Sequence, residues 1–97
     1  MIVRWVHMEF AEADRAAFLA LFDAHRHAIA SQPGCRRLEL VCDADNSCQI
    51  STLSHWDSVE DLDRYRHSVL FSEVWPATKA LFCRRPSATT FTQLRTC

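Results

Sequence analysis

The segment that most constrains this fold is IVRWVHMEF, at residues 2–10. Its β-branched and aromatic residues predict a β-strand. Successive strand residues point to opposite faces of a sheet, and here both sets are largely apolar: Trp5 and His7 alternate with Val6 and Met8. A strand that is apolar on both faces needs cover on both faces. The sequence therefore predicts a sheet that is buried on two sides.

A long amphipathic helix is predicted from Asp14 to Ser31, because large apolar side chains recur there at intervals of three and four residues. The residues of this stripe are Phe18, Leu21, Phe22, His25 and Ile29. The helix should end at SQPG, since Pro33 cannot continue the hydrogen-bond ladder. Gly34 is the only glycine in the chain and can adopt the left-handed conformation of a turn.

Two segments of alternating pattern, residues 35–44 and 48–56, lie on either side of the turn-forming cluster DADNS and predict a hairpin. A helix over residues 57–67 should follow. Ser58 stands three residues before Asp61, which is a capping arrangement for the start of that helix.

The segment VLFSEVWPATKALF, at residues 69–82, is apolar and compatible with helix, but Pro76 interrupts it. Proline lacks a backbone N–H and disfavours helical geometry before it, so we expect two short helices with a bend near Trp75. The threonine-rich segment SATTFTQLRT, at residues 87–96, predicts the last strand.

The resulting order is β-α-β-β-α-β, within a single domain of residues 1–97. This order predicts an α+β, ferredoxin-like fold: an antiparallel sheet with both helices on one face. The other face of the sheet then lacks cover. Because several strands are apolar on both faces, we expect a homodimer formed by sheet-to-sheet packing.

Composition argues against several classes of partner. The formal net charge is -1 and basic residues are scattered, so no nucleic-acid-binding surface is expected. No apolar run approaches the roughly 20 residues that span a bilayer, and no signal-peptide pattern is present, so we expect a cytoplasmic protein without a membrane partner. The five cysteines include no C-x-x-C pair, and no metal-ligand cluster is visible.

Four short motifs, in this order along the chain, carry a family resemblance. They are PGC at residues 33–35 followed by an LEL strand, WDSVEDL at 56–62, YRHSVLF at 65–71, and the Trp75–Pro76 step. With the element order, they resemble the antibiotic-biosynthesis monooxygenase superfamily of dimeric α/β barrels. The resemblance implies a pocket between the sheet and the helices of each protomer. It also implies oxidation of an aromatic, polyketide-like or quinol substrate by molecular oxygen, with no metal or flavin cofactor.

The chain departs from some of these relatives. Histidines that many members carry on the second helix would align with Tyr65 and fall near Leu70. In the heme-degrading branch the iron-binding histidine would fall at Trp75. None of these histidines is present, so the resemblance does not extend to the heme mechanism.

The candidate catalytic residues are side chains that could accept a proton or orient a phenol: His25, Tyr65 and His7. The candidate substrate-binding residues are Trp5, Phe22, His55, Phe71 and Trp75. Whether Trp5, His7 and His55 line the pocket or the dimer interface depends on which sheet face meets the helices.

Activated phenols, once deprotonated, can pass an electron directly to oxygen, so the protein need only bind the ring, remove a proton and exclude water. Together with the aromatic and histidine content, the resemblance implies a cofactor-independent monooxygenase for a small aromatic or quinol molecule. Two alternatives remain at the level of sequence: a non-catalytic dimeric module that binds a hydrophobic molecule, and an isomerase of small carbonyl compounds on the same scaffold.

Overall fold

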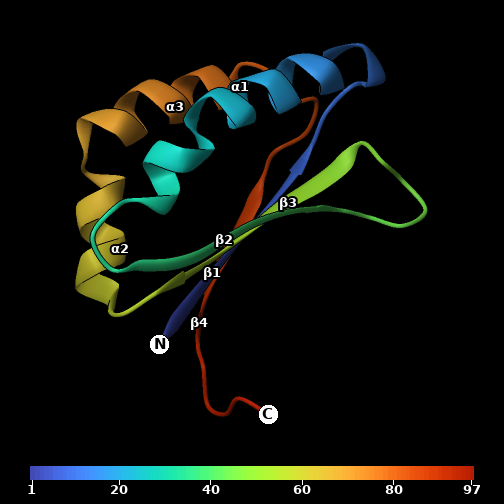
Figure 1. Ribbon diagram of the computed structural model, residues 1–97. Coiled ribbons are helices and arrows are strands. Elements are labelled where there is room, and N and C mark those ends of the chain that lie inside the picture. Colours follow the sequence, from blue (N-terminus) through green and yellow to red (C-terminus); the bar gives the residue numbers. More distant parts are fainter.

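The computed structural model describes all residues from 1 to 97. The chain forms one antiparallel sheet, and helices cover one face of it (Figure 1). The sheet has four strands in the order β2-β3-β1-β4. The predicted α+β, ferredoxin-like fold is confirmed. In chain order the elements are β1 (Ile2–Glu9), α1 (Glu12–Ala30), β2 (Cys35–Cys42), β3 (Gln49–Trp56), α2 (Val59–Arg66), α3 (Val69–Lys79) and β4 (Ser87–Thr92).

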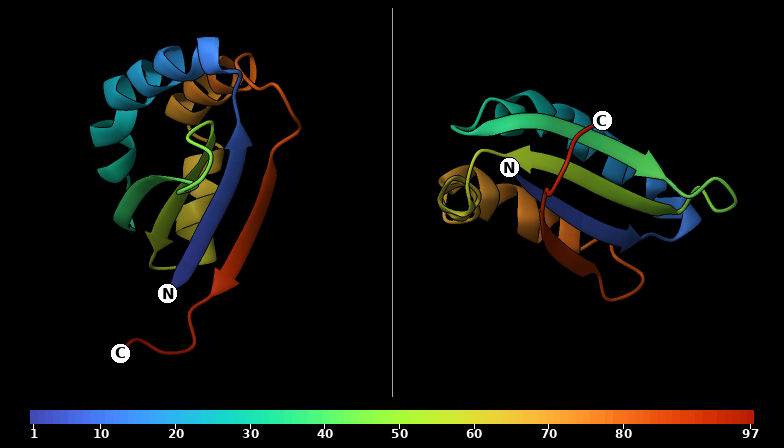
Figure 2. Two further views of the ribbon diagram at one scale, coloured as in Figure 1. Left: turned by 90° about the vertical axis from the view of Figure 1, so that its right-hand side faces the viewer. Right: turned by 90° about the horizontal axis from the view of Figure 1, so that it is seen from below.

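Strand β1 lies inside the sheet, paired antiparallel with β3 and with β4. Trp5 stands opposite Leu53 on β3 and Thr89 on β4. Its even positions face the helices, and Met8 is almost fully buried there. Its odd positions face the other side of the sheet, which no helix covers (Figure 2). The two-sided apolar pattern of β1 thus corresponds to an interior strand with one covered face and one open face.

The core lies where the C-terminal end of β1 meets α1. Met8, Phe10, Phe18 and Ile50 form its centre, each no more than 2% exposed. The rings of Phe10 and Phe18 stack with their centroids 4.3 Å apart. Burial of each such side chain contributes about 2 kcal/mol to folding. This packing holds α1 against the sheet.

A second buried anchor stands at the end of β3. Trp56 is fully buried, and its indole N–H donates a 2.9 Å hydrogen bond to the hydroxyl of Ser54. The predicted cap of the next helix is confirmed, since the Ser58 hydroxyl accepts from the backbone N–H of Asp61 at 3.2 Å. The anchor and the cap together fix where α2 leaves the sheet.

The predicted bend near Trp75 is wrong. Helix α3 is continuous, and Pro76 lies inside it on the exposed side. The proline removes one backbone donor, but its own carbonyl still accepts from the N–H of Ala80 at 3.1 Å. The break falls earlier, at His67, because the Ser68 hydroxyl accepts the N–H of Phe71 at 3.1 Å and begins a new helix. A serine cap is therefore the stronger signal here.

Strand β4 ends at Thr92, before the end of the predicted segment 87–96, and the residues beyond it leave the sheet (Figure 1).

No helix of the protein is both long and apolar enough to cross a bilayer.

We expect Gly34→Ala to destabilise the protein by more than about 1 kcal/mol. Gly34 has φ +82°, and a Cβ there would lie 2.4 Å from the carboxyl carbon of Asp61. Chemical denaturation of the variant checks this. In an Asp61→Ala background the same glycine change should cost less, because the clash with the Asp61 carboxyl is gone, while the contact with the Cβ of residue 61 at 2.6 Å and the backbone strain remain. Equal costs in both backgrounds would show that the Asp61 contact is unimportant.

Candidate functional site

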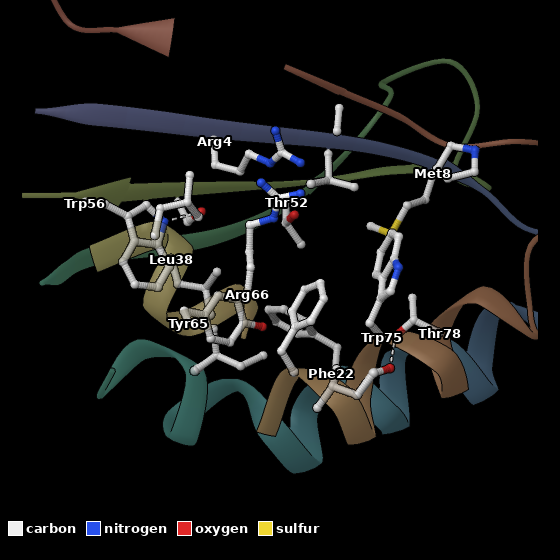
Figure 3. Close-up of a pocket in the computed structure, with 18 of the residues that line it drawn as sticks. Arg4, Met8, Phe22, Leu38, Thr52, Trp56, Tyr65, Arg66, Trp75 and Thr78 are labelled. Atoms are coloured by element: carbon white, nitrogen blue, oxygen red, sulfur yellow. Dashed lines mark hydrogen bonds between the residues drawn. The ribbon is translucent and has the colours of Figure 1, made fainter. Parts of the chain in front are cut away.

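A cavity of about 260 Å³ lies between the helix-facing side of the sheet and the three helices (Figure 3). Strand β1 contributes alternate residues to it, because only its even positions face the helices. The lining from the strands includes Arg4, Val6, Met8, Leu38, Thr52, Ser54 and Trp56, and that from the helices includes Phe18, Phe22, Ile29, Leu62, Tyr65, Arg66, Phe71, Val74, Trp75 and Thr78.

One wall of the cavity is a continuous run of aromatic rings. Trp56 and Tyr65 stack with centroids 5.3 Å apart, and Tyr65 meets Phe71 edge to face at the same distance. Phe71 then stacks on Trp75 at 5.8 Å. Rings packed in this way hold one another in place. Trp56 is fully buried and supports Tyr65 from within, whereas the partly exposed rings of Tyr65, Phe71 and Trp75 offer flat apolar surface to a flat ligand. The wall depends on the break at His67, which brings the end of α2 and the start of α3 together.

The Tyr65 hydroxyl is the one acidic group of the lining. Burial, and to a lesser degree the nearby Cys35 thiol, raises the pKa of Tyr65 to about 12. The phenol therefore stays protonated at neutral pH, so it can donate a hydrogen bond to a ligand oxygen but is a poor proton acceptor. No Asp, Glu or His side chain lines this cavity.

Two arginines supply the charge of the cavity. Arg4 comes from β1 and donates a 2.8 Å hydrogen bond to the neutral hydroxyl of Thr90. Arg66 comes from the last turn of α2, and the carboxylate nearest to it, that of Asp63, is 3.9 Å away. Figure 3 shows the two guanidinium groups pointing toward each other beside Thr52. Burial and, to a lesser degree, the charge of Arg66 lower the pKa of Arg4.

The structure brings together four of the sequence-predicted site residues. Tyr65, Phe22, Phe71 and Trp75 all line the cavity. Tyr65, Phe71 and Trp75 belong to the aromatic wall. Phe22 approaches the cavity from α1 (Figure 3).

The other predicted residues lie elsewhere. Trp5, His7 and His55 are on the open face of the sheet, and His7 Nδ1 is 3.1 Å from the hydroxyl of Ser51. His25 is on α1, outside the lining, with Nδ1 2.8 Å from the carbonyl oxygen of Leu21. The alternative that the odd face of β1 meets the helices is thus ruled out, whereas the catalytic roles of His7 and His25 stay predictions.

Sequence reasoning missed Arg4 and Arg66. Arg4 had a detectable signal, because it is the one charged residue among the even positions of β1, between Ile2 and Val6. A charge on the helix-facing side of an interior strand has few structural uses. Arg66 follows Tyr65 on a helix rich in exposed charges, and nothing in the sequence separates it from Arg64.

The protein has no group of three or more His, Cys, Asp or Glu side chains placed to hold a metal ion. The chemistry that its own residues can offer at the cavity is therefore stacking, hydrogen-bond donation and positive charge.

Comparison with solved structures shows the same fold in distant relatives. Rv0793 from Mycobacterium tuberculosis superposes with a TM-score of 0.89 at 22% identity, covering 98% of this chain and 96% of its own. An antibiotic biosynthesis monooxygenase superposes at 0.89 with 14% identity, covering 98% and 100%. A conserved protein from Methanosarcina mazei Go1 superposes at 0.90 with 16% identity, covering 97% and 94%. At such identities the likeness concerns the fold.

No curated protein matches the sequence. A family model does: that of the antibiotic biosynthesis monooxygenases matches residues 1–76, from β1 to within α3 and including most of the cavity lining. The chain belongs to the antibiotic biosynthesis monooxygenase family.

Proposed function

We propose that this protein is a monooxygenase that oxidises a small aromatic or quinol molecule with molecular oxygen, without a metal or organic cofactor. Family membership supports the reaction class. The observation that carries the substrate class is the aromatic wall of Trp56, Tyr65, Phe71 and Trp75 along one cavity.

The proposed reaction requires few groups from the protein. An anthrone-type ring loses a proton to solvent and passes an electron to oxygen, and a C–O bond then forms at the ring carbon. The resulting peroxide takes up a proton, and loss of water breaks the O–O bond and leaves the carbonyl of a quinone. One oxygen atom stays in the product and the other leaves in water. The aromatic wall orients the ring and excludes water, and the Tyr65 hydroxyl donates a hydrogen bond to the substrate oxygen that carries the developing charge.

A second candidate function is binding without turnover. The observation that favours it is that no imidazole or carboxylate lines the cavity, so that no side chain there accepts a proton readily at neutral pH. A ligand that raises the melting temperature but consumes no oxygen would favour this reading.

We also propose that the open face of the sheet is covered by a second copy of the chain. This face carries Trp5 and Leu53 at its centre, while Val41 and Phe91 are 42% and 46% exposed. The segment after β4 includes Leu94, which is 81% exposed. An identical face offers matching apolar area through a two-fold axis, which is the commonest arrangement of homodimers. We further propose a cytoplasmic location, which the five unpaired cysteines support.

We expect oxygen uptake above the buffer rate with at least one member of a panel of hydroquinones and anthrones. Val74→Trp fills the cavity and should lower this rate at least tenfold, since Val74 is part of the lining. Val69→Trp is the matched control, because Val69 is on the same helix and 74% exposed. A panel without any oxygen uptake, or equal rates in the two variants, would contradict the proposal.

Tyr65→Phe should lower kcat/KM about tenfold, because it removes one hydrogen bond to a charged oxygen but keeps the stacked ring. The pKa of about 12 means that wild-type Tyr65 stays protonated, so the ratio of the two rates should be constant between about pH 6 and pH 9. His25→Gln and His7→Gln, which change residues outside the cavity, should leave the rate within about twofold. A large loss in either variant would instead make that imidazole the proton acceptor.

Leu53→Lys should convert the dimer into a folded monomer, as measured by sedimentation equilibrium and circular dichroism. Leu53 is central on the open face, and the Glu39 carboxylate, which Arg37 already bonds, stands opposite it on β2, so a lysine there lies beside a negative charge of its own sheet. Ala24→Lys on the exposed side of α1 is the control and should leave the dimer intact. A wild-type protein that is monomeric at all concentrations would refute the dimer.

A further inference from the structure

The cavity pairs an apolar, aromatic interior with positive charge that its own residues do not neutralise. Arg4 has no carboxylate partner, and its hydrogen bond goes to the hydroxyl of Thr90. The hydroxyl of Ser54, directly opposite Arg4 on β3, accepts a hydrogen bond from the indole N–H of Trp56 and makes none with Arg4. A partly buried guanidinium without an anion is costly, so such groups are normally paired. The free donors of Arg4 point to a partner from outside the chain.

Arg66 adds a second positive charge that lacks a close anionic partner. Its guanidinium lies beside that of Arg4 (Figure 3), and like charges at this range repel each other. Its single ion pair, with Asp63, is at the outer limit of such contacts, at 3.9 Å on the surface. The other surface arginines of α2 and its surroundings are better paired, since Arg64 and Arg36 bond carboxylates at 2.9 Å and 2.6 Å. An anion placed between Arg4 and Arg66 would relieve the repulsion and use the free donors of both.

We propose that the cavity binds an aromatic carboxylate, whose two carboxylate oxygens lie between Arg4 and Arg66 and whose ring lies against the aromatic wall. A carboxylate offers two oxygens to two planar forks of donors, whereas a phenolate offers one. A cavity of about 260 Å³ is near the lower end of the ligand pockets of proteins, roughly 300–1,000 Å³, and suits a molecule of one or two rings. This inference deepens the proposed function, and rests on it for the role of the bound acid as substrate.

The test compares three probes of the same ring: 2-naphthoate, its methyl ester and 2-naphthol, by isothermal titration calorimetry at neutral pH. Wild-type protein should bind 2-naphthoate at least tenfold more tightly than the ester, and added salt should weaken binding of the acid only. Preference for 2-naphthol, which is a neutral phenol at this pH, over 2-naphthoate would assign the cavity to a phenol and overturn the carboxylate. Equal affinity for all three probes would overturn the anion site altogether.

Arg4→Gln and Arg66→Gln should each lower the affinity for 2-naphthoate about tenfold while leaving that for the ester unchanged. Unchanged ester binding shows that the cavity is intact, and Arg66 provides a surface-accessible second variant if the β1 change impairs folding. Arg64→Gln, on the same helix but paired with Asp61, is the matched control and should bind the acid as wild type does. Selectivity for the acid that survives in both cavity variants would overturn the inference.

Oxygen uptake separates this inference from the proposed function. Selective binding of naphthoate without turnover of any hydroxyaromatic acid would leave the anion site standing and contradict the monooxygenase. Turnover of neutral quinols together with equal binding of acid and ester would support the monooxygenase and overturn the anion site.

Discussion

The structure depends on the placement of β1 inside the sheet. This strand pairs with β3 from Ile2 to Glu9 and with β4 from Ile2 to His7, so most of its backbone groups are hydrogen-bonded within the sheet. Its side chains determine what each face of the sheet contributes. On the helix side it serves two purposes. Met8 and Phe10, at and just beyond its end, join the core under α1, whereas Arg4 and Val6 nearer its start line the cavity. The same strand thus supplies both the rigid support and part of the site.

Contacts between the turn at Gly34 and the start of α2 set the direction of α2, and with it the position of Tyr65. The carbonyl oxygen of Gly34 accepts from the backbone N–H of Asp57 at 2.9 Å, which ties the turn after α1 to the start of α2. Arg36 donates two hydrogen bonds, of 2.8 and 2.6 Å, to the carboxylate of Asp57. These bonds lower the pKa of Asp57 and raise that of Arg36. An exposed ion pair adds little stability by itself, so the role of this one is mainly geometric.

The site combines residues whose usefulness appears only in combination. Tyr65 by itself is a packed ring with a hydroxyl, and Arg4 by itself is a charge on a strand. Around one cavity they provide a hydrogen-bond donor and an anion anchor along a wall of stacked rings. His7, His25 and His55, which attract attention in the sequence, have their places in the sheet and helix surfaces instead.

By itself the sequence determined the element order, the fold class, the turn at Gly34, the cap at Ser58 and the aromatic residues Tyr65, Phe71 and Trp75 of the cavity. These follow from local periods and from residues with restricted chemistry, which a linear pattern records. Only the tertiary structure decided which face of the sheet each strand residue occupies. It alone decided that α3 continues through Pro76. It also decided that Arg4 and Arg66, 62 positions apart in a chain of 97, meet at one cavity. Period-two alternation cannot say which side of a sheet the helices cover, and a charge reveals its partners only when the elements pack.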